Sequence, residues 1–252
     1  DMTVEDFRRS ARVSAPWLCE LELGLGERIC RATEVTRAEV GCNTNLGILL
    51  LAAPLLAAFL SPVRRSSLHE ALRQTLATTS VDDATWVYRA IRCANPAGLG
   101  DAAEQDVHDK PTVSLCDAMR LAADRDRVAR QYSDSFADIF RIAVPLYDAR
   151  LSLGDDEEWA RVAVFVSFLS RHPDSHIERK FGADQARQVS SRTTEAEIRL
   201  AGCESTHQRL EILRDLDREF KAGGINPGTS ADLTVATLLA ARSAMLQVGG
   251  LN

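Results

Sequence analysis

Apolar residues recur every three or four positions through most of the chain, which is the spacing of one face of an α-helix. Stretches in which β-branched and polar residues alternate, the pattern of a half-buried strand, are nearly missing. The pattern therefore predicts an all-α fold. The expected helices cover residues 4–15, 20–40, 46–59, 66–78, 81–94, 114–143, 157–169, 182–201, 206–222 and 230–248.

Chain length sets the expected domain organisation. A chain of 252 residues, 45% of them hydrophobic, can bury one sizeable core, although it would also suffice for two smaller domains. Because no stretch has the composition of a linker, we expect a single-domain multi-helix bundle over residues 1–252. The most apolar stretch, residues 48–60, is too short to span a membrane and contains Pro54, so we interpret it as a buried core helix.

Cysteine usage and charge narrow the classes of function. The six cysteines lie far apart, and no secretory segment opens the chain, which favours reduced thiols in a cytoplasmic protein. The net charge is −6, with 27 arginines and three lysines, which argues against nucleic-acid binding. An anionic ligand would therefore have to be held by local geometry.

Irregular segments between the predicted helices are rich in Gly, Pro, Asn and Asp. The backbone tolerance and short side chains of these residues suit loops that bind ligands. These segments are residues 41–47, 95–100, 103–109, 171–182 and 223–232.

The last of these segments is a Gly-rich turn that leads into an apolar helix. Asn226, Gly228, Thr229 and Ser230 lie where the first N–H groups of the helix lack intrahelical partners, and such a start attracts phosphate oxygens. Asp232 could serve the cap or present a carboxylate to Mg²⁺ between phosphates. An ordinary capped turn explains the same residues and stays open as an alternative.

The first segment has a similar arrangement. Asn43, Thr44, Asn45 and Gly47 precede the most apolar helix, and their amides and hydroxyl suit ribose hydroxyls, an adenine edge or phosphate oxygens. An Asx-type cap on a buried helix is the alternative. Neither segment matches the Walker A or the Rossmann glycine pattern.

Two charged segments offer further candidates. Asp174, together with Arg179 and Lys180, could form a binding site for phosphate or Mg²⁺. We do not expect zinc there, because a proline separates the two nearby histidines and no third ligand is close in sequence. Asp126 and Arg130 are four apart on a predicted helix, which is typical of a surface ion pair.

Three motifs in this order resemble the triphosphoribosyl-dephospho-CoA synthase family: Asn-Thr-Asn-Leu-Gly with the apolar run over residues 43–51, the charged stretch 174–180, and residues 226–233. Residues 1–7 are similar to the family's Asp-Met segment, which follows Lys-Pro-Gly and Ser-His motifs that this chain lacks. We therefore expect that an N-terminal motif segment is missing.

The resemblance implies an all-α enzyme that moves the triphosphoribosyl group of ATP to 3′-dephospho-CoA, with Mg²⁺ and with release of adenine. It implies phosphate binding by residues 226–230, and charge balance by Arg179 and Lys180. It also implies Mg²⁺ or sugar contacts, and so catalytic roles, for Asp174 and Asp232. The resemblance further implies that the residues of the first motif contact the ribose or base: Asn43, Thr44, Asn45 and Gly47.

The chain also departs from the family pattern. Asn45 and Leu46 stand where many members carry His and Lys, and Arg130 lies in the region of their Gly-Ala-Arg-Gly-Glu stretch, where we expect it to bind nucleotide. Such divergence leaves open a related acceptor, including a methanopterin-linked one-carbon cofactor precursor, or a non-catalytic nucleotide-binding protein. The expected partners are ATP and a small-molecule acceptor, without nucleic acid or membrane, and a homodimer is a possible assembly.

Overall fold

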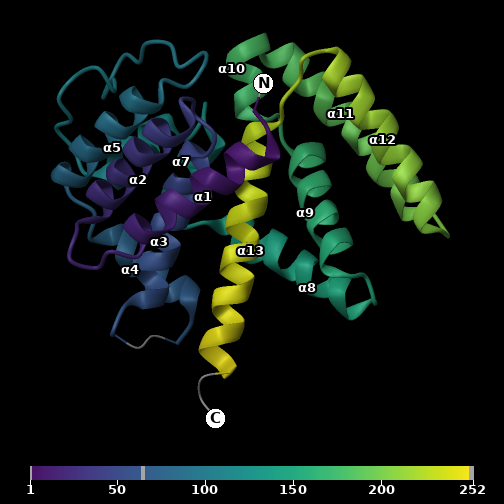
Figure 1. Ribbon diagram of the computed structural model, residues 1–252, viewed down its shortest axis with the longest axis horizontal. Helices are drawn as coiled ribbons and strands as arrows, with labels where there is room; N and C mark the ends of the chain where they lie inside the picture. The colour runs from purple at the N-terminus through teal and green to yellow at the C-terminus, as the bar shows by residue number, and fades with distance from the viewer. Residues whose placement is uncertain (1, 64–65, 250–252) are drawn as a thin grey trace.

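The protein is described by a computed structural model that covers residues 2–63 and 66–249. This part of the chain contains helices and no strand, so the predicted all-α class is confirmed (Figure 1). The helices are α1 Val4–Leu18, α2 Leu25–Val40, α3 Leu46–Leu60, α4 Leu68–Ala77, α5 Val81–Ala94, α6 Leu115–Ala122, α7 Arg127–Ser133, the π-helix η1 Ile139–Ala143, α8 Val144–Ser152, α9 Glu157–Arg171, α10 Ser175–Phe181, α11 Ala183–Ala201, α12 Thr206–Ala222 and α13 Gly228–Gly249.

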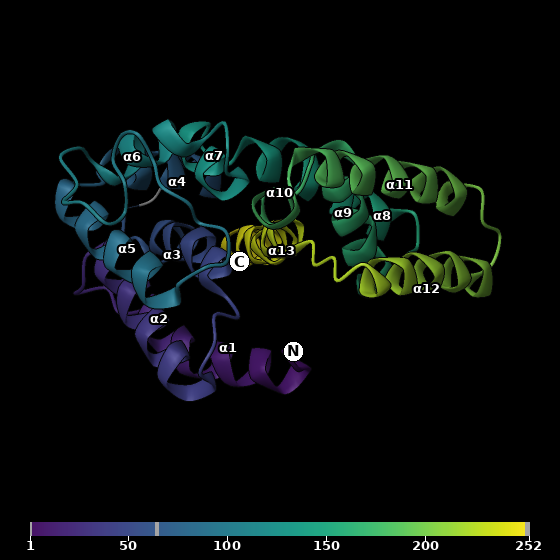
Figure 2. The ribbon, with the colours of Figure 1, turned by 90° about the horizontal axis from the view of Figure 1, so that it is seen from above.

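Helix α13 runs through the middle of the molecule. Helices α1 to α5 and α7 lie mainly on one side of it, α8, α9, α11 and α12 lie on the other, and α10 lies across its upper end (Figure 1). Seen from above, α13 is viewed nearly end-on, and α11 and α12 form an antiparallel pair that projects away from α1 to α7 (Figure 2). Within the described ranges, none of the helices combines the length and apolar character that a membrane crossing requires.

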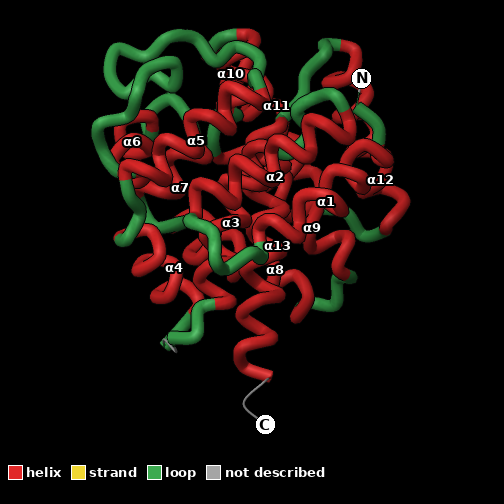
Figure 3. Tube along the Cα trace, turned by 60° about the vertical axis from the view of Figure 1, so that its left-hand side comes forward, coloured by secondary structure: helices red, strands yellow, loops and turns green. Residues whose placement is uncertain are grey.

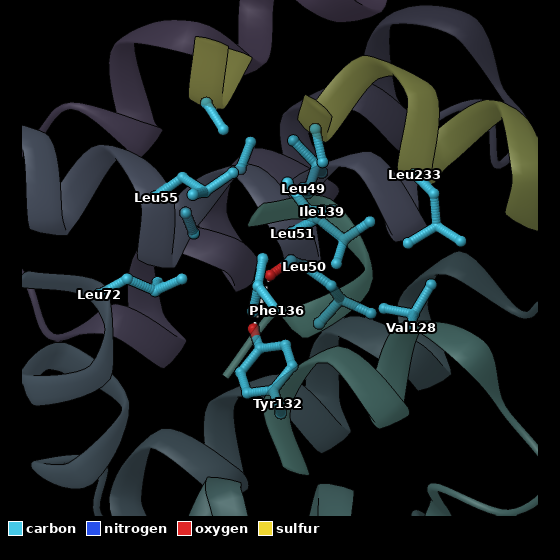
Figure 4. Close-up of a cluster of buried hydrophobic side chains, with 14 of the residues drawn as sticks. Leu49, Leu50, Leu51, Leu55, Leu72, Val128, Tyr132, Phe136, Ile139 and Leu233 are labelled. Carbon is cyan, nitrogen blue, oxygen red and sulfur yellow. Dashed lines mark hydrogen bonds between the residues drawn. The ribbon is translucent and has the colours of Figure 1, made fainter. Parts of the chain in front are cut away.

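The larger of two hydrophobic clusters surrounds α3. Leu51 and Leu55 of α3 are fully buried and belong to the same cluster as Ile139 of η1 and Leu233 of α13 (Figure 4). The buried Tyr132 hydroxyl donates a hydrogen bond of 2.6 Å to the carbonyl oxygen of Leu50. Because α3 is apolar around its whole circumference, it can be covered on nearly all sides.

A smaller cluster holds the other side of the molecule together. It contains buried residues of α9, α10, α11 and α12, among them Ile177, Val189 and Ile212. The two clusters meet in α9, where Phe168 belongs to the first and Leu169 to the second. Helix α9 therefore contributes buried residues to both clusters.

The predicted helix over residues 114–143 was wrong, because local features interrupt it twice. Asp126 begins a new helix, α7, where its Oδ1 accepts the N–H of Ala129 at 2.9 Å. Further on, Ser135 and Phe136 adopt φ angles of 59° and 61°, which no helix tolerates. The region is therefore α6, α7 and η1.

Other boundaries also differ from the prediction. The predicted helix 20–40 begins only at Leu25. Two helices were not predicted: α8, which carries a proline in its first turn, and α10, where Asp174 is the N-cap. All six cysteines are free.

Candidate functional site

A cavity of about 560 Å³ lies between α3, α5, α6 and α7 and the starts of α10 and α13. All five segments predicted to bind ligands contribute residues to its wall. The long loop between α5 and α6 passes beside α10 (Figure 3). Contact there is direct, because a Cβ on Gly98 would lie 2.5 Å from the carbonyl oxygen of Arg179. The eight predicted site residues that line the cavity are Asn43, Thr44, Asn45, Gly47, Arg179, Asn226, Thr229 and Asp232.

The start of α3 and the first turn of α13 meet at the cavity wall. A Cβ on Gly47 would lie 2.0 Å from Oδ2 of Asp232, so only glycine leaves room for this carboxyl group. Asp232 is half-buried and has no hydrogen-bond partner among the described residues. The sequence patterns at residues 43–47 and 226–232 thus form one site.

Electrostatics at Asp232 favour its protonated form. Burial, followed by the nearby carboxylates of Asp174 and Asp126, raises the pKa of Asp232 well above its usual range, while Arg179 opposes this rise. A cation beside Asp232 would reverse the preference, because it would stabilise the ionised carboxylate.

Asp174 occupies a different environment, although it was predicted for the same roles. Its buried carboxylate accepts four hydrogen bonds from the protein. Oδ1 accepts the N–H groups of His176 and Ile177, at 2.9 and 3.2 Å. Oδ2 accepts the N–H and hydroxyl of Ser230, at 2.7 and 2.8 Å. Asp174 therefore joins the start of α10 to the start of α13 and does not line the cavity.

The polar residues before α3 hold their own loop in place. Asn43 Oδ1 accepts the N–H of Leu46 at 3.1 Å, the hydroxyls of Thr44 and Ser10 share a hydrogen bond of 2.6 Å, and Asn45 Nδ2 donates to Thr36 Oγ1 at 3.4 Å. At the position of the family's lysine, Leu46 is buried in the larger hydrophobic cluster. Asn45 and Leu46, which stand where many family members carry His and Lys, are therefore both buried in the cavity wall.

The ion pair expected between Asp126 and Arg130 was wrong. Asp126 lines the cavity and pairs with Arg179, which brings the ends of two distant segments together. Arg130 pairs instead with Asp124 and Asp134, at 3.7 and 3.8 Å. The reason is that Asp126 is the N-cap of α7, so its side chain turns back toward the helix start and away from Arg130.

Several predicted nucleotide-binding residues lie outside the cavity wall. Arg130 and Lys180 are exposed, and Lys180 Nζ lies over the ring of Phe181, 5.0 Å from its centre. Ser230 is buried against Asp174. Gly228 provides space, because a Cβ there would lie 3.3 Å from the imidazole of His176. The structure does not bring these side chains to the cavity.

His176 lines the cavity and was not predicted as a site residue. Burial, followed by Arg179, lowers its pKa, although Asp174 acts in the opposite direction. The lowered pKa favours the neutral imidazole, whose ring nitrogens have no hydrogen-bond partner among the described residues. The charged residues crowded around His176 are a weak signal in the sequence, and its spacing from the other histidine bears only on zinc binding.

Two arginines at the cavity were also missed. Arg37, in the last turn of α2, and Arg125, between α6 and α7, line the cavity and form no ion pair in the described structure. Most arginines in the described structure pair with a carboxylate. Because Arg37 and Arg125 do not, their guanidinium groups are available to an anion. By contrast, no group of three His, Cys, Asp or Glu side chains in the described ranges is arranged to bind a metal ion.

Comparisons with known proteins agree with this architecture. A family model described as ATP:dephospho-CoA triphosphoribosyl transferase matches residues 1–248. The chain is 30% identical over 99 residues to a probable 2-(5''-triphosphoribosyl)-3'-dephosphocoenzyme-A synthase of Citrobacter koseri. This match covers 39% of the chain and 32% of that relative, so the chain spans about a third of the relative's length.

A solved structure extends the comparison to the fold. The chain is similar to a candidate triphosphoribosyl-dephospho-CoA synthase from Archaeoglobus fulgidus, with a TM-score of 0.72 and 24% sequence identity. The match covers 93% of this chain and 97% of that one. At this identity the similarity establishes the fold.

Proposed function

The chain belongs to the ATP:dephospho-CoA triphosphoribosyl transferase family, and from this premise we propose that it transfers the triphosphoribosyl group of ATP to 3′-dephospho-CoA. In this reaction a ribose hydroxyl of the acceptor forms a bond to C1′ of the ATP ribose, and the bond from C1′ to adenine breaks. The hydroxyl gives up its proton, and adenine leaves with one. The observation that carries the proposal is the meeting of Gly47 and Asp232 at the cavity wall.

The triphosphate is proposed to bind at the polar end of the cavity. We use "polar end" for Arg179, Asn226, Thr229 and Asp232. Arg179 supplies positive charge, and Asn226 and Thr229 supply hydrogen-bonding groups. Arg37 and Arg125, which have no ion-pair partner, are available to the phosphates of the acceptor. Two anionic substrates can therefore meet on a protein whose net charge is −6.

Asp232 fits the role of a Mg²⁺ ligand. Mg²⁺ is usually bound by one or two carboxylates together with substrate phosphates, so a site with one free carboxylate is sufficient. The carboxyl group of Asp232 faces the cavity and has no partner within the described structure, whereas the oxygens of Asp174 are engaged. When bound, the cation would neutralise charge on the triphosphate.

We propose that Asp174 is a positioning residue. By accepting N–H groups from the starts of α10 and α13, its carboxylate fixes Arg179 relative to Asp232. On the other side of the cavity, Asn43, Thr44 and Asn45 hold the loop that places Gly47 beneath Asp232 and exposes polar atoms to the ribose. The chain's main contribution is thus preorganisation of a charged and partly enclosed site.

The proposal can be tested by incubating the protein with ATP and Mg²⁺, with and without 3′-dephospho-CoA, and separating the products by chromatography. We expect free adenine that accumulates only when the acceptor is present. Absence of adenine would contradict the proposed reaction. Adenine release that does not depend on the acceptor would contradict the transfer. It would show that the protein hydrolyses the bond between ribose and adenine.

A further inference from the structure

The cavity has an apolar end, lined by side chains from α3, α5, α6 and α7. These side chains are buried, except that of Ile91, which is partly buried. We use "apolar end" for these six residues: Leu50, Val87, Ile91, Leu115, Met119 and Val128. Alanines at 94, 118, 122 and 129 line the same cavity, and their small side chains leave the space open.

We propose that the apolar end binds the adenine base of ATP, the group that leaves in the reaction. This inference rests on the proposed function and adds the place of the base within the cavity. It also assigns binding of the donor base to α5, α6 and α7, which the family motifs in the sequence do not reach.

Charge decides which part of a nucleotide fits there. None of the six side chains is charged, and a phosphate group removed from water without a counter-charge is strongly disfavoured. A flat purine ring carries no charge, so its burial costs less than that of a phosphate, and its faces gain apolar contact. The triphosphate is therefore directed to the polar end, where Arg179 lies.

Helix geometry connects the two ends. Leu50 follows Gly47 by three residues on α3, which corresponds to a rise of about 4.5 Å along the helix axis. A ribose beside Gly47 and Asp232 therefore carries its base toward Leu50, since the base is bonded directly to C1′. In a displacement at C1′ the acceptor approaches from the side opposite the leaving base, so the acceptor occupies a different part of the cavity.

A calorimetric comparison of two ligands tests the assignment. Inorganic tripolyphosphate contains the phosphates alone, whereas ATP also has the ribose and base. Ala118→Met fills part of the apolar end, and Ala38→Met makes the same change at an exposed position of α2, outside the cavity wall. With Mg²⁺ present, we expect Ala118→Met to weaken ATP binding at least about tenfold and to leave tripolyphosphate binding within about twofold, because only the base meets the new side chain.

Thermal unfolding of each variant shows whether the fold is retained. If Ala118→Met does not fold, Met119→Ala enlarges the same end and is expected to weaken ATP binding selectively, by about threefold to tenfold. An equal loss for both ligands, or unchanged ATP binding in a folded variant, would overturn the inference.

Two further outcomes separate this inference from the proposed function. If Ala118→Met weakened 3′-dephospho-CoA binding and spared ATP, the acceptor would occupy the apolar end, and the proposed transfer would still stand. If the wild-type protein released no adenine under any condition, the proposed function would fail, and the assignment of a leaving base would fail with it.

Discussion

The starts of α3 and α13 look alike in sequence and differ in the folded protein. Each follows a loop rich in Asn and Gly, and each opens an apolar helix. At α13, the N–H and hydroxyl of Ser230 donate to Asp174, a residue 56 positions earlier. At α3, Gly47 lies under the carboxyl group of Asp232, which faces the cavity without a partner among the described residues.

The difference shows what determines whether a polar helix start can bind a ligand. Residue type marks where the free N–H groups lie, but a carboxylate from a distant segment can already occupy them. Asp174 occupies the donors of Ser230 at the start of α13, whereas Asp232, in the first turn of the same helix, directs its carboxyl group toward Gly47 of α3 and the cavity. The two aspartates should therefore respond differently to mutation.

The largest expected effect is on activity. Asp232→Asn removes the ionisable carboxyl group at nearly constant size, so we expect kcat for adenine release to fall by about 10² to 10³. Thermal unfolding should change little, because the carboxyl group of Asp232 makes no hydrogen bond in the described structure. A variant with wild-type kcat would remove Asp232 from the mechanism.

The second effect is on stability. Asp174→Ala leaves the N–H groups of Ile177 and Ser230 without an acceptor, so we expect the free energy of unfolding to fall by about 2 kcal/mol. Chemical denaturation measures this change. Asp148→Ala, at an exposed position of α8, is the control and should stay within about 0.5 kcal/mol of wild type. Wild-type stability of Asp174→Ala would contradict the role of a joint.

A glycine substitution tests the contact itself. Gly47→Ala places a Cβ 2.0 Å from Asp232 Oδ2, so the carboxyl group must move, and we expect kcat/KM to fall by about tenfold. Gly202→Ala is the matched control, because its Cβ would meet nothing nearer than 3.7 Å, at the carbonyl oxygen of Arg199. If both variants kept wild-type kcat/KM, the close approach at Gly47 would have no functional meaning.

The smallest effect concerns neighbouring cations. Lys180 is exposed and does not line the cavity, so Lys180→Ala should keep kcat/KM within about twofold of wild type. Arg179→Ala removes the guanidinium group that lines the cavity and should lower ATP affinity by about tenfold. Steady-state kinetics and calorimetry on the pair give the comparison. Equal losses in both variants would show that Lys180 also reaches the substrate.

The sequence predicted the parts of the fold that depend on local pattern. Helices α5 and α12 have the predicted bounds, and the five polar segments do surround one cavity. Breaks within residues 114–143 were not predictable from apolar spacing, because they depend on the cap formed by Asp126 and on the backbone of Ser135 and Phe136. The single domain, the homodimer and the cytoplasmic location stay predictions.

Site residues that belong to a recognisable local motif were predicted from the sequence. Contacts between residues that are far apart in sequence were missed, because only the fold brings them together. Asp232 and Gly47 were both candidates, but their contact joins residues far apart in sequence. The apolar end was missed because residues such as Val87 and Met119 have the helical spacing of any core residue. His176 was not predicted as a site residue because its place in the cavity wall depends on packing beside Gly228, which spacing does not reveal.

The central claim is that the cavity at the start of α3 transfers the triphosphoribosyl group. The most direct measurement is the mass of 3′-dephospho-CoA after incubation with ATP, Mg²⁺ and either the wild-type protein or Asp232→Asn. The account predicts that wild-type protein adds one triphosphoribosyl group for each adenine released, and that the variant adds almost none while it stays folded. Adenine release without a heavier acceptor, or a fully active Asp232→Asn, would contradict it.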